Sequence, residues 1–129
     1  MTKTPDNKKR ILVIDDEELL TRTFSKLLEK QGYEVFVAKN GSDALAMVEV
    51  ETFDLIISDI RMPGKNGVDV IKAVQDFMDT NQKRRVPVIF ITGFADDQVE
   101  KKARELGPVA YLFKPFDVRE LISVVSAAV

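Results

Sequence analysis

Acidic side chains follow two apolar runs of the sequence, at the point where each run ends. Asp15, Asp16 and Glu17 come directly after the first run, and Asp59 comes directly after another. Two carboxylates about 5 Å apart repel by roughly 3 kcal/mol at an effective dielectric constant near 20, so acids that converge need a cation or a shifted pKa. Oxygen ligands of this kind suit Mg²⁺, which typically binds one or two carboxylates and a phosphate oxygen. The acids therefore predict a magnesium site that handles phosphate.

Two further polar residues also close apolar runs. Thr92 ends one run and Lys114 follows another. A hydroxyl can donate to a phosphoryl oxygen and an ammonium can neutralise developing charge, which is the work on which phosphoryl transfer mainly relies. For any single one of these motifs, the alternative of a helix cap or an ordinary loop charge stays open. The phosphoryl interpretation depends on four run ends meeting at one place.

The apolar runs are the elements that would position these groups. Five short runs rich in Ile and Val alternate with longer segments of helical period, and four of the five runs lack polar alternation. The predicted strands are Ile11 to Ile14, Glu34 to Ala38, Leu55 to Ser58, Val88 to Thr92 and Val109 to Phe113. Strands that are apolar on both faces belong to a parallel sheet with helices on both sides. We therefore predict an α/β fold of five βα units, a doubly wound five-stranded parallel sheet.

The strand order 2-1-3-4-5 is our hypothesis for this sheet, although the pattern alone leaves other doubly wound orders open. In such a sheet, ligands bind outside the carboxyl ends of the strands, at the switch point between strands one and three. Asn40 or Gly41 can start the second helix and Asp117 can cap the fifth, whereas Gly32 and Gly107 are typical helix stops. The order would bring all of the polar strand ends to one edge.

Composition narrows the functional classes. The chain has 129 residues, a net charge of −2, and no His or Cys, so catalysis on an imidazole or a thiolate is excluded. The net charge of the chain does not attract nucleic acid or an anionic membrane, and no apolar stretch is long enough to span a membrane. We expect a flexible tail over residues 1–9, one domain over residues 10–129, and a cytoplasmic protein without a secretory signal. We interpret the basic run Lys83, Arg84 and Arg85 as a solvated loop.

Four motifs resemble the receiver domain of two-component response regulators. They are ILVIDDEE at Ile11 to Glu18, DLIISDIRMPGKNG at Asp54 to Gly67, FITG at Phe90 to Gly93, and YLFKPF at Tyr111 to Phe116. The resemblance extends from about Arg10 to Val129, and it implies a flavodoxin-like fold similar to that of chemotaxis regulators. The nucleotide-binding patterns GxxxxGK and GxGxxG are missing from the sequence, so we interpret Pro63, Gly64 and Gly67 as turn residues.

The resemblance implies a role for each site residue. Asp59 would accept a phosphoryl group from a phosphohistidine, and Asp15 and Asp16 would be the magnesium-binding pair. The backbone carbonyl of Arg61 would be a further metal ligand, and Thr92 and Lys114 would contact the phosphoryl group. The acyl phosphate would later hydrolyse, so the protein would be a phosphorylation switch and not a turnover enzyme. The peptide bond between Lys114 and Pro115 matches one that is usually cis in the family.

The same resemblance implies a switch and a lifetime control. Thr92 would move towards the phosphoryl group together with a reorientation of Tyr111, for which a plain core aromatic is the alternative. Arg61 and Phe94 occupy positions that flank the phosphoryl group, and we predict that the bulk of Phe94 slows the attack of water. In the family, the fourth helix, fifth strand and fifth helix commonly carry output contacts. A merely solvated fourth helix is the competing interpretation.

Two other functional classes compete with the switch. A pure interaction module would keep the fold without using phosphate, but every expected site residue is present. A phosphatase with an aspartyl nucleophile typically carries Asp-x-Asp, which neither Asp15-Asp16 nor Asp59-Ile60-Arg61 supplies. The expected partners are a sensor histidine kinase or phosphotransfer protein and a downstream protein or fused output domain. A phosphorylation-dependent homodimer is possible, and we expect no direct contact with nucleic acid or membrane.

Overall fold

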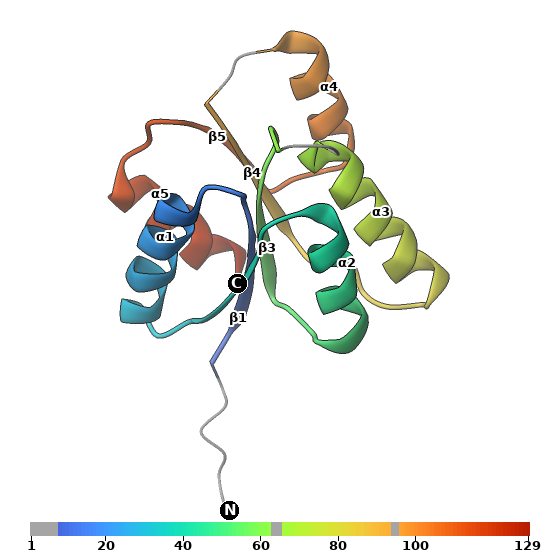
Figure 1. Ribbon diagram of the computed structural model, residues 1–129, viewed down its shortest axis with the longest axis horizontal. Coiled ribbons are helices and arrows are strands. Elements are labelled where there is room, and N and C mark those ends of the chain that lie inside the picture. The colour runs from blue at the N-terminus through green and yellow to red at the C-terminus, as the bar shows by residue number, and fades with distance from the viewer. Residues whose placement is uncertain (1–7, 63–65, 94–95) are drawn as a thin grey trace, which may run out of the picture.

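The computed structural model describes residues 8–62, 66–93 and 96–129. Within these residues, five strands alternate with five helices along the chain (Figure 1). The elements are β1 (Arg10–Ile14), α1 (Glu18–Lys30), β2 (Glu34–Ala38), α2 (Gly41–Val50), β3 (Leu55–Asp59), α3 (Gly67–Thr80), β4 (Val88–Thr92), α4 (Asp97–Glu105), β5 (Ala110–Phe113) and α5 (Val118–Ala128). None of the described helices is long and apolar enough to cross a membrane.

The strands form one parallel sheet in the order β2-β1-β3-β4-β5. The predicted α/β fold class and strand order are therefore confirmed. The predicted strand ranges differ from the observed ones by single residues at three ends. Arg10 begins β1 because it pairs with Glu34, and Asp59 extends β3 because it pairs with Ile91. The fifth strand starts at Ala110, one residue later than predicted.

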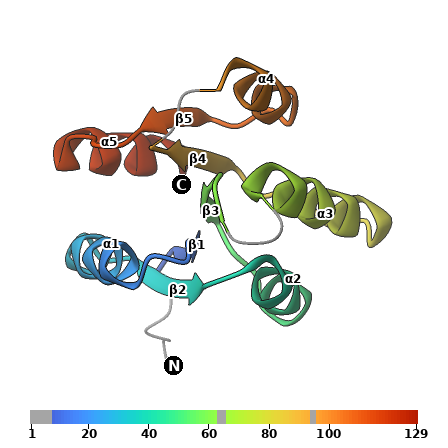
Figure 2. The same ribbon diagram turned by 45° about the horizontal axis from the view of Figure 1, so that its top comes forward.

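Helices cover both faces of the sheet, and each face has its own apolar core. Figure 2 shows α1 and α5 on one side of the sheet and α2 and α3 on the other. Successive residues of β1 alternate between the two cores, with Ile11 and Val13 in the first and Leu12 and Ile14 in the second. The α4 residue Ala103 is fully buried in the core on the side of α2 and α3. Two-sided burial explains why the central strands read as continuous apolar runs.

The predicted helix signals hold where the structure describes them. The Asn40 side chain caps α2 by accepting a hydrogen bond from the backbone N–H of Asp43. Asp117 caps α5 in the same way through the N–H of Arg119. Gly32 and Gly107, which follow α1 and α4, have positive φ angles of 93° and 73°. Glycine adopts this left-handed conformation without the steric cost of a Cβ, so both helices end where the sequence predicts.

Candidate functional site

Asp15 and Asp59 lie at the carboxyl ends of neighbouring central strands. Asp59 is the last residue of β3, and Asp15 directly follows β1, whose Ile14 pairs with Ser58. Their exposed fractions are only 1% for Asp15 and 3% for Asp59. Carboxylates are almost never this buried unless they are paired or bind a cation. The two acids therefore sit at the switch point of the sheet, as the strand order predicts.

The Asp15 carboxylate is only partly satisfied by hydrogen bonds. Its Oδ1 atom accepts a 2.9 Å bond from the backbone N–H of Glu17, which holds the turn between β1 and α1. Its Oδ2 atom is buried and has no hydrogen-bond partner among the described residues. Glu17 occupies the N-cap position of α1, but its side chain accepts no capping hydrogen bond. The Glu17 carboxylate therefore does not cap the helix. A buried carboxylate oxygen without a donor is expected where a cation binds.

Lys114 reaches the same acids from the end of β5. Its ammonium donates hydrogen bonds to Glu17 Oε1 at 3.0 Å and Asp59 Oδ2 at 3.2 Å, and it lies 3.6 Å from Asp15 Oδ2. The backbone N–H of Lys114 donates to the carbonyl of Thr92 at 2.8 Å, which fixes this strand end against β4. The Lys114–Pro115 peptide bond is cis, as the resemblance implies. One ammonium thus contacts three carboxylates that come from two other segments.

These contacts change the ionisation of both partners. Burial raises the pKa of Asp15 to about 6, and the charge of Asp59 adds to this, although the N–H of Glu17 and the Lys114 ammonium act against it. Burial disfavours the charged form of Lys114, but the hydrogen bond to Glu17 and the charges of Asp15 and Asp59 outweigh it. The net result is that the pKa of Lys114 is raised. The site therefore holds more negative charge than one ammonium compensates.

The oxygen ligands of the site fit a hard divalent cation. One carboxylate oxygen from each of Asp15, Glu17 and Asp59 lies within 4.8 Å of the others. Together with the unbonded Oδ2 of Asp15, this all-oxygen set suits Mg²⁺ or a similar ion. The third acid in this cluster is Glu17, not Asp16; both residues are exposed, and the role of Asp16 as a ligand stays a prediction. Arg61 is also near, since its backbone N–H lies 3.4 Å from Asp59 Oδ1.

Thr92 is buried at the end of β4, next to β3, with an exposed fraction of 1%. A cavity of about 250 Å³ opens beside it. Ile60, Arg61, Asn66, Asp96 and Val99 complete its lining. This space adjoins the strand ends that carry the acids, so the structure places Thr92 on the expected side of the sheet.

Tyr111 lies one strand further, paired with Phe90 across β4 and β5. Its ring is half-buried and packs against Phe90 and Phe113 at centroid distances of 6.4 and 5.3 Å. The Arg104 guanidinium of α4 lies 5.0 Å from the ring centroid. Burial and the charge of Glu100 raise the pKa of the Tyr111 hydroxyl. The ring thus links β4 to α4, and its role as a switch stays a prediction.

Sequence reasoning missed two features of this site. It named Glu17 among the acids after the first strand but did not assign it a contact with Lys114. It also interpreted Gly67 as a turn residue, whereas Gly67 is buried against the backbone of Asp59, where a Cβ would overlap the Asp59 carbonyl oxygen. The glycine at the start of a predicted helix was the only available signal. Phe94, Pro63 and Gly64 lie outside the described residues.

Comparisons with known proteins identify the family and the fold of the chain. The sequence model of the response regulator receiver domain matches residues 11–126, which is nearly the whole chain. The chain belongs to this family. The receiver domain is similar to the chemotaxis response regulator CheY4 of Vibrio cholerae, with a TM-score of 0.83 and 28% identity over 95% of this chain and all of that one. The resemblance stated from the motifs is therefore confirmed.

Curated relatives of the receiver domain fall into two groups by length. The polar-differentiation response regulator DivK of Brucella anthropi is 34% identical over 119 residues, which cover 92% of this chain and 94% of DivK. The transcriptional regulatory protein CpxR of Escherichia coli is 37% identical over 118 residues, but only 48% of CpxR is covered. For PdtaR of Mycobacterium tuberculosis, 32% identity extends over 57% of the relative. The chain thus spans about half the length of these transcriptional regulators.

Proposed function

We propose that this receiver domain is a phosphorylation switch in which Asp59 takes a phosphoryl group from a phosphohistidine on a partner protein. The observation that carries the proposal is the contact of the Lys114 ammonium with Asp59 and Asp15, both buried at the strand ends. In the transfer, an oxygen of Asp59 bonds to phosphorus as the bond from phosphorus to the histidine nitrogen breaks. The product is an acyl phosphate on Asp59. Lys114 would compensate the negative charge of the transferred group, and Thr92 would donate a hydrogen bond to it.

Asp15, Asp16 and Asp59, with the backbone carbonyl of Arg61, are the proposed ligands of Mg²⁺. The unbonded Oδ2 of Asp15 and the nearby Asp59 carboxylate support the ion. Asp16 and the Arg61 carbonyl are added on the basis of the family resemblance. When bound, Mg²⁺ would neutralise charge on the phosphoryl oxygens. The Lys114 hydrogen bond that Glu17 accepts would hold the ammonium beside Asp59 without using an Asp59 oxygen. We propose that Glu17 supports Lys114 and is not itself a ligand.

The proposed output begins at Thr92 and Tyr111. Movement of the Thr92 side chain towards the phosphoryl group would let the Tyr111 ring leave its contact with Arg104 and turn inwards. This would alter the surface of α4, β5 and α5, where we place the downstream contacts. Arg61 and Phe94 would set the lifetime of the acyl phosphate. Phe94→Asn should speed dephosphorylation, and an unchanged or slower rate would refute the role of Phe94.

A sensor histidine kinase or phosphotransfer protein is the proposed phosphoryl donor, in the cytoplasm. The output partner would be a fused domain, as the greater length of CpxR and PdtaR suggests, or a separate protein. We place the receiver domain at residues 10–129 with a tail at residues 1–9, and a homodimer formed on phosphorylation remains part of the proposal. The protein would catalyse only its own phosphorylation and slow dephosphorylation.

Labelling with a small-molecule donor tests the proposal. The protein is incubated with acetyl phosphate or phosphoramidate and Mg²⁺, and acyl phosphate is measured by intact mass and by its lability at alkaline pH. Wild type should gain one phosphoryl group, Asp59→Asn should gain none, and EDTA should prevent the reaction. Asp54→Asn is the matched control, because Asp54 precedes the same strand at its other end. A wild type that is never labelled would indicate an interaction module, and donor turnover far beyond one equivalent would indicate an enzyme.

The ligand assignment has a separate test in Mg²⁺ binding, measured by calorimetry without any donor. Asp15→Asn and Asp16→Asn should each weaken binding by about tenfold or more, the order of magnitude found when groups that support a metal site are lost. Glu17→Gln should weaken binding less than Asp16→Asn does. The opposite ranking would move the ligand role from Asp16 to Glu17.

A further inference from the structure

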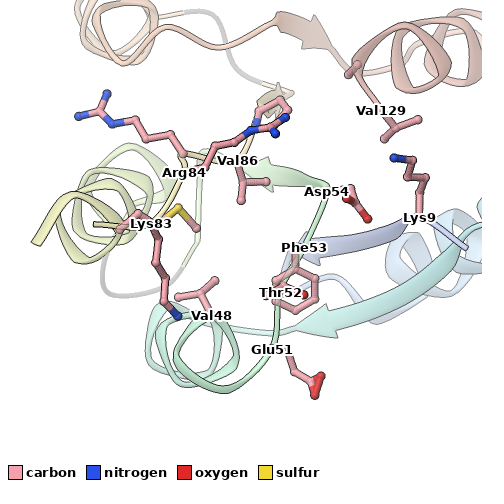
Figure 3. Close-up of a pocket in the computed structure, with 14 residues that line it drawn as sticks. Lys9, Val48, Glu51, Thr52, Phe53, Asp54, Lys83, Arg84, Val86 and Val129 are labelled. Atoms are coloured by element: carbon pink, nitrogen blue, oxygen red, sulfur yellow. The ribbon is translucent and has the colours of Figure 1, made fainter. Parts of the chain in front are cut away.

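A second cavity lies at the amino ends of the strands, at the opposite end of the sheet from Asp59. Its volume is about 500 Å³, within the range typical of small-molecule sites. Figure 3 shows it between the segment that follows α2, the segment that precedes β4 and the carboxyl end of the chain. The apolar part of the lining includes Val48, Phe53, Met78 and Val86. Phe53 and Met78 are almost completely buried, so the apolar floor is part of the core.

The two acidic residues of this cavity, Glu51 and Asp54, already have partners. Asp54 accepts a 2.8 Å hydrogen bond from the backbone N–H of Arg10, and Glu51 forms a 3.0 Å ion pair with the Arg10 guanidinium. That guanidinium also pairs with Glu34 at 3.3 Å and lies over the Phe36 ring. The two carboxylates are therefore held by a residue outside the cavity lining. The charge of Glu51 is compensated by an ion pair, whereas the hydrogen bond leaves Asp54 with its negative charge.

The basic residues of the cavity are in the opposite situation. Among the described residues, only Arg85 of this group has a carboxylate partner: it donates two hydrogen bonds of 3.0 and 2.6 Å to Asp79. Lys83 lies 5.3 Å from the centroid of the Phe77 ring, and neither Lys9 nor Arg84 forms an ion pair among the described residues. Three cations, Lys9, Lys83 and Arg84, thus border the apolar floor together with one acid, Asp54, that has no ion pair among the described residues, so the rim carries net positive charge. A rim of positive charge attracts anionic ligands.

We propose that this cavity, the basal pocket, binds a small organic anion whose apolar body lies on Phe53 and Val86. Figure 3 shows Lys83 and Arg84 pointing to different sides of the lining, so the carboxylate or phosphate of the ligand would be attracted by the summed positive charge of the rim. The run of basic residues would then be a ligand rim and not only a solvated loop. None of the basal-pocket residues belongs to the acidic site. Five-residue strands rise about 16 Å, so a ligand here would leave access to Asp59 unobstructed.

Two fluorescent compounds with the same aromatic body test the charge requirement. 8-Anilinonaphthalene-1-sulfonate is an apolar anion, and N-phenyl-1-naphthylamine is its neutral counterpart. Each is titrated into wild type, into Lys83→Gln/Arg84→Gln, and into Lys102→Gln/Arg119→Gln. The third protein is the matched control, since it loses the same two charges from exposed positions on α4 and α5.

The anion should bind wild type and the control equally, and the Lys83→Gln/Arg84→Gln variant should bind it about five- to tenfold more weakly, as expected for two partly exposed charge contacts. The neutral compound should bind wild type more weakly than the anion and should not distinguish the three proteins. Backbone amide shifts in nuclear magnetic resonance should change at Phe53, Val86 and Val129. Equal loss of anion binding in the control, tight binding of the neutral compound, or shifts confined to another surface would overturn the proposal. Labelling of Asp59 is not used in this test, so its outcome is independent of the phosphorylation proposal.

Discussion

The exposed acid Glu17 is linked to the buried acid Asp59 through the Lys114 ammonium. The Lys114 ammonium is shared by two hydrogen-bonded carboxylates, and the shorter of the two bonds goes to Glu17. Glu17 is largely exposed, with 61% of its side chain accessible, so its bond is weaker in water than its length suggests. Glu17 nevertheless contributes to the position of the Lys114 ammonium beside Asp59.

Replacing Glu17 with Gln should lower the pKa of Lys114, because the hydrogen bond to a charged Glu17 is among the influences that raise it. Nuclear magnetic resonance of the Lys114 side chain, followed against pH, measures this directly. Glu18→Gln is the control, since Glu18 pairs with Arg22 on the surface of α1. A Lys114 pKa that is the same in both variants would show that Asp59 and Asp15 alone hold the ammonium.

The site residues that could be predicted from the sequence are those whose positions the strands determine. Asp15, Asp59, Thr92 and Lys114 could be placed together because the carboxyl ends of parallel strands share one edge. The choice between Asp16 and Glu17 as neighbour of Lys114 could not be made, since it depends on how the turn before α1 directs each side chain. The sequence shows which strand end an acid follows, but the path of the three-residue turn decides which acid reaches Lys114.

At the scale of elements, the junction of β3 and α3 is the most constrained part of the site. The N–H of Gly67 donates a 2.7 Å hydrogen bond to the carbonyl of Ile60, and Asn66 caps α3 through the N–H of Asp69. A Cβ on Gly67 would overlap the carbonyl oxygen of Asp59 and lie 2.9 Å from its carbonyl carbon. The start of α3 therefore packs directly against the backbone of Asp59.

Gly67→Ala should destabilise the protein by about 1–3 kcal/mol, because backbone atoms must move to make room for the methyl group. It should also slow labelling of Asp59. Urea unfolding followed by circular dichroism measures the free energy. Gly93→Ala is the comparison, since among the described residues a Cβ there would meet the Lys114 side chain alone, at an ordinary 3.7 Å. Equal stability of the two variants would mean that α3 shifts without cost.

The elements themselves were largely predictable, because two-sided burial leaves an unmistakable pattern in β1, β3 and β4. The edge strands β2 and β5 were harder to predict. In β2 only Ala38 is buried, and in β5 only Leu112 is. Edge strands are partly solvated, so their sequences constrain their ends weakly, and the predicted start of β5 at Val109 was one residue early. The approach of Gly67 to Asp59 was invisible, because it joins two segments whose spacing only the folded chain defines.

For the molecule as a whole, the acidic site is a source of instability when no cation is bound. The pKa of Asp15 rises from an ordinary value of 3.8 to about 6 on folding. Between these pH values the native state binds more protons than the unfolded chain does, so stability should fall as the pH rises from about 4 to about 6 and stay low above that range.

Asp15→Asn should remove this pH dependence and, in EDTA at pH 7, stabilise the protein by an amount on the order of 1–3 kcal/mol. Urea unfolding at pH 5 and pH 8 in EDTA measures both effects. Addition of Mg²⁺ at pH 8 should stabilise wild type and leave the variant nearly unchanged. A wild type and variant with the same difference between pH 5 and pH 8 would exclude Asp15 as the titrating group.

The strand order could be proposed in advance because right-handed crossovers leave few arrangements for five βα units. The basal pocket could not be predicted from the sequence. Its rim and floor come from the ends of several elements, including Lys9, Phe53 and Arg84, which are far apart in the chain. A basic run in the sequence does not reveal whether its charges are paired. In the fold, Asp79 pairs with Arg85, and Arg10 binds the cavity acids Glu51 and Asp54.

The aromatic packing around Tyr111 also has a spectroscopic consequence. The chain has two Tyr residues and no Trp, so its intrinsic fluorescence comes from Tyr33 and Tyr111 alone. Tyr33 packs in the core on the side of α1 and α5, away from the contact between Tyr111 and Arg104. A Tyr33→Phe protein would therefore carry one native fluorophore, located on β5 beside α4. Its emission would report the surroundings of that ring in real time, without an attached dye.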